Sequence, residues 1–266
     1  MACTRSNSHG LRDSERARFA SDGYLVVEQL FSAEEMARLR ERGRELAQPG
    51  VALQSASQQV EPAVAEGNAS APSYAESLRK LKHVAAGDAV FLAHAGDPRI
   101  LDIVEQFLGP DIVLASDNVF MKPPRVGSRQ NYHQDALAGF FLEPPEQLVS
   151  CWCAIDRATI ENGCLWMIPG SHRGGPLTPD QRAQYALGAD GSEPLGAVPV
   201  ELQPGGCVFH HGLTLHGSRA NASALPRWGY ATHYASARCR PSGDRPRDMA
   251  RPPYLTMRGR RFPGCL

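Results

Sequence analysis

The sequence predicts a mainly β fold with helices at its flanks, on three observations. From Asp111 onward, short β-prone runs alternate with Gly, Pro and Asn turns, a spacing typical of an antiparallel sandwich or barrel. Before that point, capping residues and apolar stripes recur at helical spacing. No internal repeat is found. The β-prone runs are residues 112–121, 131–135, 147–156, 164–168, 197–202, 206–212, 214–218 and 228–236.

A capping box marks the start of an amphipathic helix over residues 33–47. The Ser32 hydroxyl can cap the first turn while Glu35 reaches back, and both satisfy amide groups that the helix leaves free. Met36 and the leucines after it share one face, so we expect this helix to pack on a larger body. A short β-rich run at residues 24–29 precedes it.

A second helix is expected to begin at Asp97-Pro98, where an N-cap residue precedes proline at the first helical position. Its apolar stripe ends at Gly109-Pro110, a helix stop signal. We also expect a helix over residues 76–83.

Composition and charge exclude several classes of protein. With 42% hydrophobic and 21% charged residues, the chain can bury a sizeable core. Its formal net charge of zero gives no general attraction to nucleic acid or to an anionic membrane. The seven cysteines show neither a CxxC nor a zinc pattern, which favours reduced thiols in the cytosol. Residues 1–18 lack the apolar core of a signal peptide, and no run is long enough to span a bilayer, so we predict a cytoplasmic protein.

We predict one domain over residues 1–266. Residues 19–110 form a mostly helical support, residues 111–236 form the β core, and residues 237–266 form an irregular, Arg-rich segment. Residues 50–76 are rich in Ala, Ser, Gln and Gly without clear periodicity. Long segments of this kind are flexible surface loops or lids over a substrate, and the sequence leaves both open.

Three residues form a candidate metal site. His133 and Asp135 flank Gln134, so on a strand their side chains point to the same face. Such a triplet often arises by chance, and the alternative is a surface pair or a buried structural histidine. His216, in a later β-like run, would complete two imidazoles and one carboxylate, the set that holds Fe(II) with three adjacent positions open.

Three other histidines compete for the role of ligand. His172 lies in a Pro-Gly-Ser-His loop and is better suited to a structural hydrogen bond; the preceding residues 162–171 are predicted as turn, buried strand and turn. His210 and His211 are adjacent, so on a strand they point to opposite faces, one toward the core and the other toward solvent.

Arg227 follows His216 at the start of another β-like run. A hairpin of that length would bring Arg227 beside His216, where its planar guanidinium could hold a carboxylate at two points. A 2-oxoglutarate-dependent oxygenase needs such a clamp on the distal carboxylate of its cosubstrate. The alternative is an ordinary exposed arginine.

Several short motifs over residues 19–236 stand in the order seen in one known family. They are Asp22-Gly23-Tyr24, Leu108-Gly109-Pro110-Asp111, Lys122-Pro123-Pro124, His133-Gln134-Asp135, Glu161-Asn162-Gly163-Cys164-Leu165, Pro169-Gly170-Ser171-His172, and His216-Gly217-Ser218 followed by Arg227. On these motifs the chain resembles the phytanoyl-CoA dioxygenase family of Fe(II)/2-oxoglutarate oxygenases. The resemblance implies a double-stranded β-helix (a cupin-like jelly roll) with flanking helices, and an enzyme that uses Fe(II), 2-oxoglutarate and O2.

The resemblance also implies residue roles. It assigns His133, Asp135 and His216 to iron. Lys80 matches a family lysine for which Lys82 is a competing alignment, and Asn118 falls where the family often has methionine. The residues assigned to 2-oxoglutarate are Arg227, Ser218, Trp152, Lys80 and Asn118.

The predicted reaction is hydroxylation of a C–H bond of a small molecule, with release of succinate and CO2. Asp135 favours this outcome, because related halogenases carry a small residue at the carboxylate position. Desaturation and ring formation diverge after the same hydrogen abstraction and stay open. A jelly-roll protein that binds a metal or acid without turnover would be expected to lack a ligand or the clamp. A zinc hydrolase would leave Arg227 and Trp152 unexplained and would need a general base.

The substrate is predicted only by class: a secondary metabolite, an amino acid or an acyl compound, with a role in natural product biosynthesis. Gln134, Phe140 and Phe141 are candidates to line its pocket, with a core cluster as the alternative reading. The Arg-rich residues 238–262 could attract an anionic substrate or a carrier protein, or form a solvated tail. Residues 50–76 and 175–196 are the variable segments expected to decide specificity.

Overall fold

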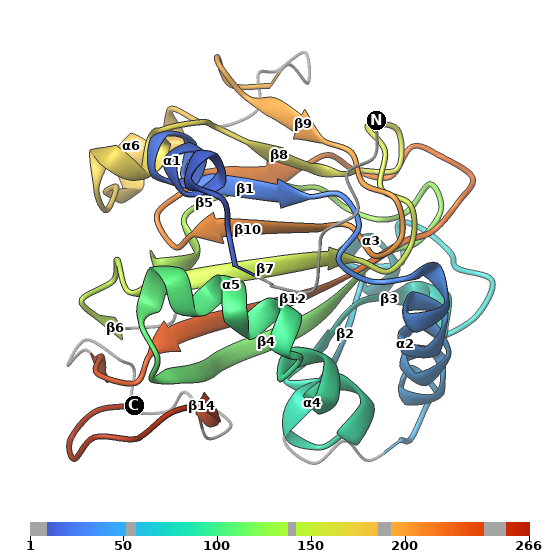
Figure 1. The fold of residues 1–266 in the computed structure, drawn as a ribbon. Coiled ribbons are helices and arrows are strands. Elements are labelled where there is room, and N and C mark those ends of the chain that lie inside the picture. Colours follow the sequence, from blue (N-terminus) through green and yellow to red (C-terminus); the bar gives the residue numbers. More distant parts are fainter. Residues whose placement is uncertain (1–9, 52–56, 138–141, 186–192, 242–253) are drawn as a thin grey trace.

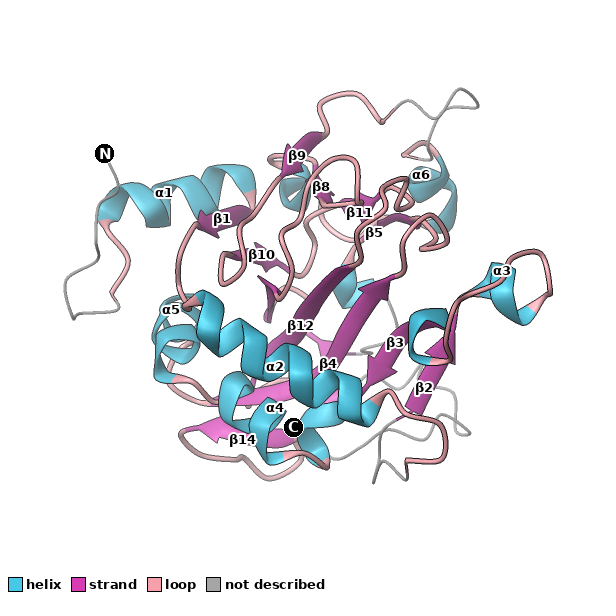
Figure 2. Cartoon of the chain, turned by 90° about the vertical axis from the view of Figure 1, so that its right-hand side faces the viewer, coloured by secondary structure: helices cyan, strands magenta, loops and turns pink. Residues whose placement is uncertain are grey.

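The computed structural model of the protein describes residues 10–51, 57–137, 142–185, 193–241 and 254–266. Two antiparallel sheets face each other, and helices cover the far side of the larger one (Figures 1 and 2). Phe140 and Phe141, two candidates for the substrate pocket, lie outside the described residues.

The larger sheet has eight strands in the order β1–β10–β7–β12–β4–β3–β2, with β14 also paired to β4 (Figure 1). All of its pairs are antiparallel. Its strands are β1 (Tyr24–Val27), β2 (Ser57–Val60), β3 (Leu78–Lys82), β4 (Ile112–Lys122), β7 (Leu148–Ala154), β10 (Cys207–His211), β12 (Arg227–Ser236) and β14 (Leu255–Arg258).

The smaller sheet has four strands in the order β5–β11–β8–β9. They are β5 (Gln130–His133), β11 (His216–Ser218), β8 (Leu165–Met167) and β9 (Val198–Val200). A separate pair joins β6 (Leu142–Glu143) to β13 (Arg240–Pro241). The two facing sheets make the predicted double-stranded β-helix, and the β-prone runs after Asp111 are its strands.

Both faces of the larger sheet are covered, so β7 and β12 at its centre are buried along their whole length. In β12, Trp228 and Tyr230 pack into the core under the helices, whereas Ala231 packs into the core between the sheets. We call these the outer and inner faces. Alternation along a strand therefore places neighbouring residues in different cores, and every residue of β12 is buried.

Helices pack on the outer face of the larger sheet (Figures 1 and 2). The helix at Ala33–Leu46 has the predicted capping box, with Ser32 Oγ accepting from the Glu35 amide. The helix at Pro98–Leu108 is capped by Asp97 as predicted. The α-helices are α1 (Asp13–Asp22), α2 (Ala33–Leu46), α3 (Pro62–Ala65), α4 (Ala89–Ala95), α5 (Pro98–Leu108) and α6 (Pro179–Ala183), and the 3-10 turns are η1 (Ala75–Ser77), η2 (Val84–Ala86), η3 (Asp135–Leu137) and η4 (Ser171–Gly174).

The helix predicted over residues 76–83 is wrong, because this segment is the strand β3 after a single 3-10 turn. Leu78 and Leu81 both enter the outer core and so imitate the i, i+3 spacing of a helix. The strand form is selected by pairing with β2 and β4, a long-range interaction that outweighs local helix propensity.

The support and tail segments are also more regular than predicted. Residues 57–60 pair with β3 and extend the larger sheet, so the segment 50–76 is not wholly a loop; residues 52–56 are outside the described part, and the lid stays a prediction. In the C-terminal segment, β14 pairs with β4, and Arg258 forms ion pairs with Asp102 and Glu105. Residues 242–253 are likewise outside the described part.

Among the described helices, none has both the length and the apolar character needed to cross a bilayer.

Candidate metal centre and cosubstrate pocket

The three predicted ligands converge between the two sheets. His133 ends β5 and His216 begins β11, and the two are register partners on neighbouring strands. Asp135 Oδ1 lies 3.3 Å from His133 Nε2 and 3.5 Å from His216 Nε2. The donor atoms of all three lie within 4.8 Å of one another, the one such group of His, Cys, Asp or Glu found in the described part of the chain.

This donor set fits a metal ion. Ligand atoms at about 2.1 Å from a metal lie about 3.0 Å apart at octahedral angles and about 3.4 Å apart at tetrahedral angles, and the two separations measured from Oδ1, 3.3 and 3.5 Å, are of this size. The orientation of the imidazoles also fits. His133 Nδ1 lies 2.8 Å from the Asn131 carbonyl and His216 Nδ1 lies 3.0 Å from the Thr214 carbonyl, so both rings donate through Nδ1–H and present the Nε2 lone pair to the site.

Two of the ligands, Asp135 and His216, favour the protonation states that a metal needs. Burial raises the pKa of Asp135, but the adjacent imidazoles, His216 and His233 foremost, hold it well below its usual range. Burial lowers the pKa of His216 well below its usual range. The Asp135 carboxylate and a neutral His216 imidazole are therefore available at neutral pH.

His133 and Asp135 were expected on one strand, but the backbone leaves the strand between them. β5 ends at His133, and Asp135 begins the 3-10 turn η3. Gln134 between them is fully buried; its amide donates to the Gly175 and Leu213 carbonyls, and its oxygen accepts from the Leu177 amide. These contacts fix the turn that brings the two ligands together, and a substrate role for Gln134 stays a prediction.

Three further residues lie beside Asp135; Ser150 and His233 were missed by sequence reasoning, whereas His210 was considered as a competing ligand. Ser150 Oγ lies 2.7 Å from Asp135 Oδ2, His233 Nδ1 lies 3.3 Å from it, and His210 Nε2 lies 3.5 Å from it. His210 is the inward member of the His210–His211 pair, as the alternation predicted. The sequence carries no local signal for this cluster, because its members come from β7, β12 and β10.

His172 makes the structural contact expected of it, with Nε2 3.2 Å from the Ala20 carbonyl. The preceding segment is also as predicted, since β8 is a buried strand followed by a turn.

Arg227 is a buried cation whose Nε has no hydrogen-bond partner. It is 2% exposed, and no ion pair joins it to a described residue, although Asp156 and Glu61 act on it electrostatically from farther away. Trp152 lies beside it, with its ring centre 5.3 Å from the guanidinium carbon. Burial lowers the pKa of Arg227 to about 10, and at neutral pH the group stays charged. An uncompensated buried charge is costly, so this environment suits an anionic ligand.

The expected hairpin from His216 to Arg227 is wrong. His216 belongs to β11 in the smaller sheet, whereas Arg227 begins β12 in the larger sheet and pairs with Lys122. The chain crosses from one sheet to the other between them. Arg227 is thus brought toward the centre by the facing of the sheets.

The other residues assigned to 2-oxoglutarate lie on both walls. The alternation of β3, β4, β7 and β12 places Lys80, Asn118 and Trp152 on the inner face with Arg227. Ser218 is buried on β11 in the opposite sheet.

Lys80 is a poorly solvated cation on this inner face. Its Nζ lies 4.5 Å from the Phe120 ring centre. Burial and the nearby Arg79 and Lys82 lower the pKa of Lys80 to about 8. Lys82, two residues along the same strand, also lies on the inner face, opposite Asn118.

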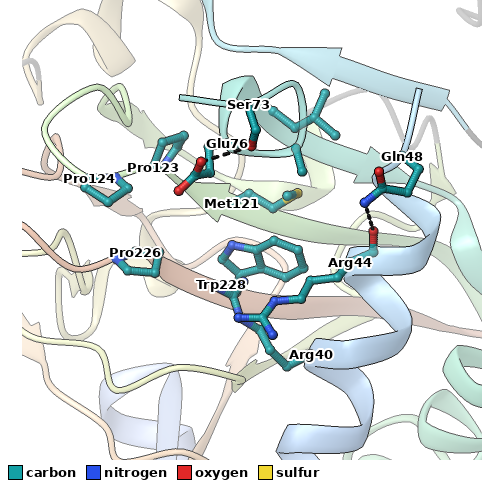
Figure 3. A pocket seen from close by; sticks show the side chains of 12 residues that line it. Arg40, Arg44, Gln48, Ser73, Glu76, Met121, Pro123, Pro124, Pro226 and Trp228 are labelled. Carbon is teal, nitrogen blue, oxygen red and sulfur yellow. Dashed lines mark hydrogen bonds between the residues drawn. The ribbon is translucent and has the colours of Figure 1, made fainter. Parts of the chain in front are cut away.

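A separate pocket lies on the outer face, between α2 and β12 (Figure 3). Arg40 stacks over Trp228 there, with its guanidinium carbon 3.7 Å from the ring centre. Trp228 follows Arg227 but points to the opposite face of the sheet. This pocket is therefore not part of the metal centre.

Fold and site together define the class. It is a jelly-roll protein with two histidines and one aspartate converging between its sheets and a buried arginine on the inner face of the larger sheet. A model of the phytanoyl-CoA dioxygenase (PhyH) family matches residues 19–229. Mouse (Mus musculus) phytanoyl-CoA dioxygenase domain-containing protein 1 is 30% identical over 277 residues, which cover 89% of this chain and 92% of the mouse protein. The chain belongs to the phytanoyl-CoA dioxygenase family.

Solved structures share the fold over nearly the whole chain. EctD from S. alaskensis with 2-oxoglutarate and 5-hydroxyectoine superposes with a TM-score of 0.72 at 24% identity, covering 95% of this chain and 89% of EctD. The non-heme alpha ketoglutarate dependent epimerase SnoN from nogalamycin biosynthesis gives a TM-score of 0.70 at 22% identity, covering 93% of this chain and 98% of SnoN.

Proposed function

We propose that this protein is an Fe(II)- and 2-oxoglutarate-dependent dioxygenase that hydroxylates a C–H bond of a small molecule. The observation that carries the proposal is the buried Arg227, whose Nε has no partner, on the larger sheet opposite the strands of His133 and His216. A metal site alone does not explain a second, cationic site. A ligand that chelates the metal at one end and carries a carboxylate at the other explains both.

His133, Asp135 and His216 would hold the iron, which supplies O2 activation coupled to oxidative decarboxylation of 2-oxoglutarate. Solved structures similar to this chain include EctD with 2-oxoglutarate and 5-hydroxyectoine, and SnoN with Fe3+, alpha ketoglutarate and nogalamycin RO. Because these structures share the fold of this chain, they support the proposal that iron and 2-oxoglutarate bind between its two sheets.

The protein side chains bind and orient the cosubstrate. Arg227 would hold the distal carboxylate with parallel hydrogen bonds, which gain strength where water is excluded. Trp152 forms an apolar wall beside it, and Ser218 would add a hydroxyl from the opposite sheet. Lys80 supplies a second cation on the same face.

Asp135 supports hydroxylation over halogenation, because its carboxylate occupies the position that a halide would need. The substrate is a small molecule, with a secondary metabolite, an amino acid or an acyl compound as the proposed classes and natural product biosynthesis as the proposed context. The cytoplasmic location stays a prediction.

The test is iron-dependent binding and turnover of 2-oxoglutarate by purified protein. Succinate is measured with Fe(II), ascorbate and a panel of small molecules, and the 2-oxoglutarate Kd is measured without O2. Arg227→Met should raise that Kd at least 100-fold, since a charged hydrogen-bonded pair contributes several kcal/mol. Arg38→Met is the matched control, because Arg38 lies on the exposed side of α2 beside Glu34. No iron-dependent 2-oxoglutarate binding by the wild type, together with no succinate, would refute the proposal.

A further inference from the structure

We propose that Ser150 and His233 are positioning residues that hold Oδ2 of Asp135 and leave Oδ1 as the single carboxylate oxygen for the metal. This inference rests on the proposed metal-dependent function. It concerns which oxygen of the Asp135 carboxylate faces the metal. The identity of the three ligands does not decide this.

The two oxygens of Asp135 have different surroundings. Oδ1 faces Nε2 of His133 and Nε2 of His216, at 3.3 and 3.5 Å. Oδ2 faces Ser150 Oγ at 2.7 Å and His233 Nδ1 at 3.3 Å. One oxygen is therefore turned toward the other ligands, and the other is turned toward the larger sheet.

The hydrogen bonds run in one direction. The Asp135 carboxylate can only accept, so the single proton of the Ser150 hydroxyl points to Oδ2. Ser150 Oγ then accepts from His233 Nδ1, which lies 2.8 Å away. His233 must carry its proton on Nδ1. The result is a directed chain from His233 through Ser150 to Asp135.

Strand register builds this chain. Ser150 on β7 and His233 on β12 are direct register partners, and both side chains point to the inner face. Each is nearly fully buried, as is Asp135. A buried carboxylate without donors is costly, so the chain stabilises Asp135 in one orientation before any metal binds. His210 also lies on the Oδ2 side, 3.5 Å away through Nε2.

The orientation matters for the number of free metal positions. A carboxylate that binds through both oxygens takes two positions, as calcium sites show. With Oδ2 held by Ser150, Asp135 would bind through Oδ1 alone. Three adjacent positions then stay open, enough for a bidentate cosubstrate and one further ligand.

The experiment compares two serines that flank His233. Ser150→Ala removes the hydroxyl that contacts Asp135. Ser116→Ala is the matched control, because Ser116 on β4 is also a register partner of His233 but contacts His83 rather than Asp135. Fe(II) affinity is measured by competition with a chelator, and Co(II) absorption is used as the probe of coordination geometry.

We expect Ser150→Ala to weaken Fe(II) binding 10- to 100-fold, as is typical for loss of an outer hydrogen-bond partner of a ligand, and to alter the Co(II) spectrum. Ser150→Thr, which keeps the hydroxyl, should restore most of the affinity, and Ser116→Ala should match the wild type. His233→Gln should weaken binding as well. The double variant should lose at least as much affinity as either single variant, because Ser150 and His233 both lie against Oδ2, and the two losses should not simply add, because the residues also contact each other.

Equal effects of Ser150→Ala and Ser116→Ala would overturn the inference, as would wild-type affinity and an unchanged Co(II) spectrum in Ser150→Ala. If Ser150→Ala does not fold, His233→Gln takes its place, and wild-type metal affinity and spectrum in that variant would overturn the inference. A wild type that binds no metal would refute the proposed function itself, which is a distinguishable result.

Discussion

The Trp152 indole lies directly against the backbone of Gly229. A Cβ placed on Gly229 would clash with the indole ring and come within 2.8 Å of its Nε1. Gly229 and Trp152 lie on the paired strands β12 and β7. The absence of a side chain at Gly229 is what allows the indole to lie on the inner face beside Arg227.

Gly229→Ala should displace Trp152 and weaken 2-oxoglutarate binding about 10-fold or more, because the apolar wall beside the clamp would be lost. The substitution also forces a rearrangement in a close-packed core, a cost of about 1–3 kcal/mol. Anaerobic 2-oxoglutarate titration and thermal unfolding measure the two effects. Gly174→Ala is the control, since a Cβ there meets nothing, and equal 2-oxoglutarate affinities in the two variants would contradict the role given to Trp152.

Lys80 should make 2-oxoglutarate binding depend on pH. The lysine is a cation below its pKa of about 8 and neutral above it, so the 2-oxoglutarate Kd should rise as the pH increases from 7 to 9. The Kd is measured across that range with the metal bound. Lys80→Arg keeps the charge throughout and should flatten the rise. A rise of the same size in Lys80→Arg would exclude Lys80 as its source.

Asp135→Ala should abolish tight metal binding while the protein stays folded. The barrel is stabilised by its buried strands, and the site between them adds few apolar contacts. Metal affinity should fall by more than the 10- to 100-fold typical of an outer partner, with a circular dichroism spectrum like that of the wild type. Full activity in this variant would show that Asp135 is not a ligand.

The acid stability of the protein should depend on Glu35. Arg99 joins the starts of α2 and α5, with Nη2 2.6 Å from Glu35 Oε1 and 2.8 Å from Asp97 Oδ2. The hydrogen bond from Arg99, opposed by burial, is the main reason that the pKa of Glu35 falls to about 2. Because the folded pKa is lowered, this stabilisation is fully present above pH about 4.5 and is lost as the pH falls toward 2.

Glu35→Gln isolates the charge, because glutamine still completes the capping box. At neutral pH the variant should be less stable by about 1 kcal/mol, the upper end for a partly exposed pair. Below pH 3 the two proteins should converge. Urea unfolding at pH 7 and pH 2.5 tests this, and a constant difference between the proteins would count against the ion pair.

Local sequence patterns were enough for some features. The capping residues Ser32, Glu35 and Asp97 contact backbone atoms within three residues, so the helix starts that they mark can be predicted without knowing the fold. The same holds for most strands after Asp111, where residue type and turn spacing agree. The helix predicted over residues 76–83 was wrong, because Leu78 and Leu81 have helical spacing but belong to a strand whose partners are distant in the sequence.

The metal ligands could be predicted from the sequence only in part. Residue types and order identified His133, Asp135 and His216, and the family resemblance supplied their roles. Their convergence, however, depends on β5 lying beside β11 and on the turn that Gln134 fixes. Arg227 was expected near His216 through a hairpin and instead begins a strand of the opposite sheet.

The amino-acid order alone established which groups are available for chemistry: two imidazoles, one carboxylate and a guanidinium in a mainly β chain. Only the tertiary structure decided that Ser150 and His233 lie against one oxygen of Asp135 and that Arg227 is buried with its Nε unpartnered. The physical reason is that the direction of a hydrogen bond and the burial of a side chain depend on the residues around it. Here those residues lie on strands that are far apart in the chain.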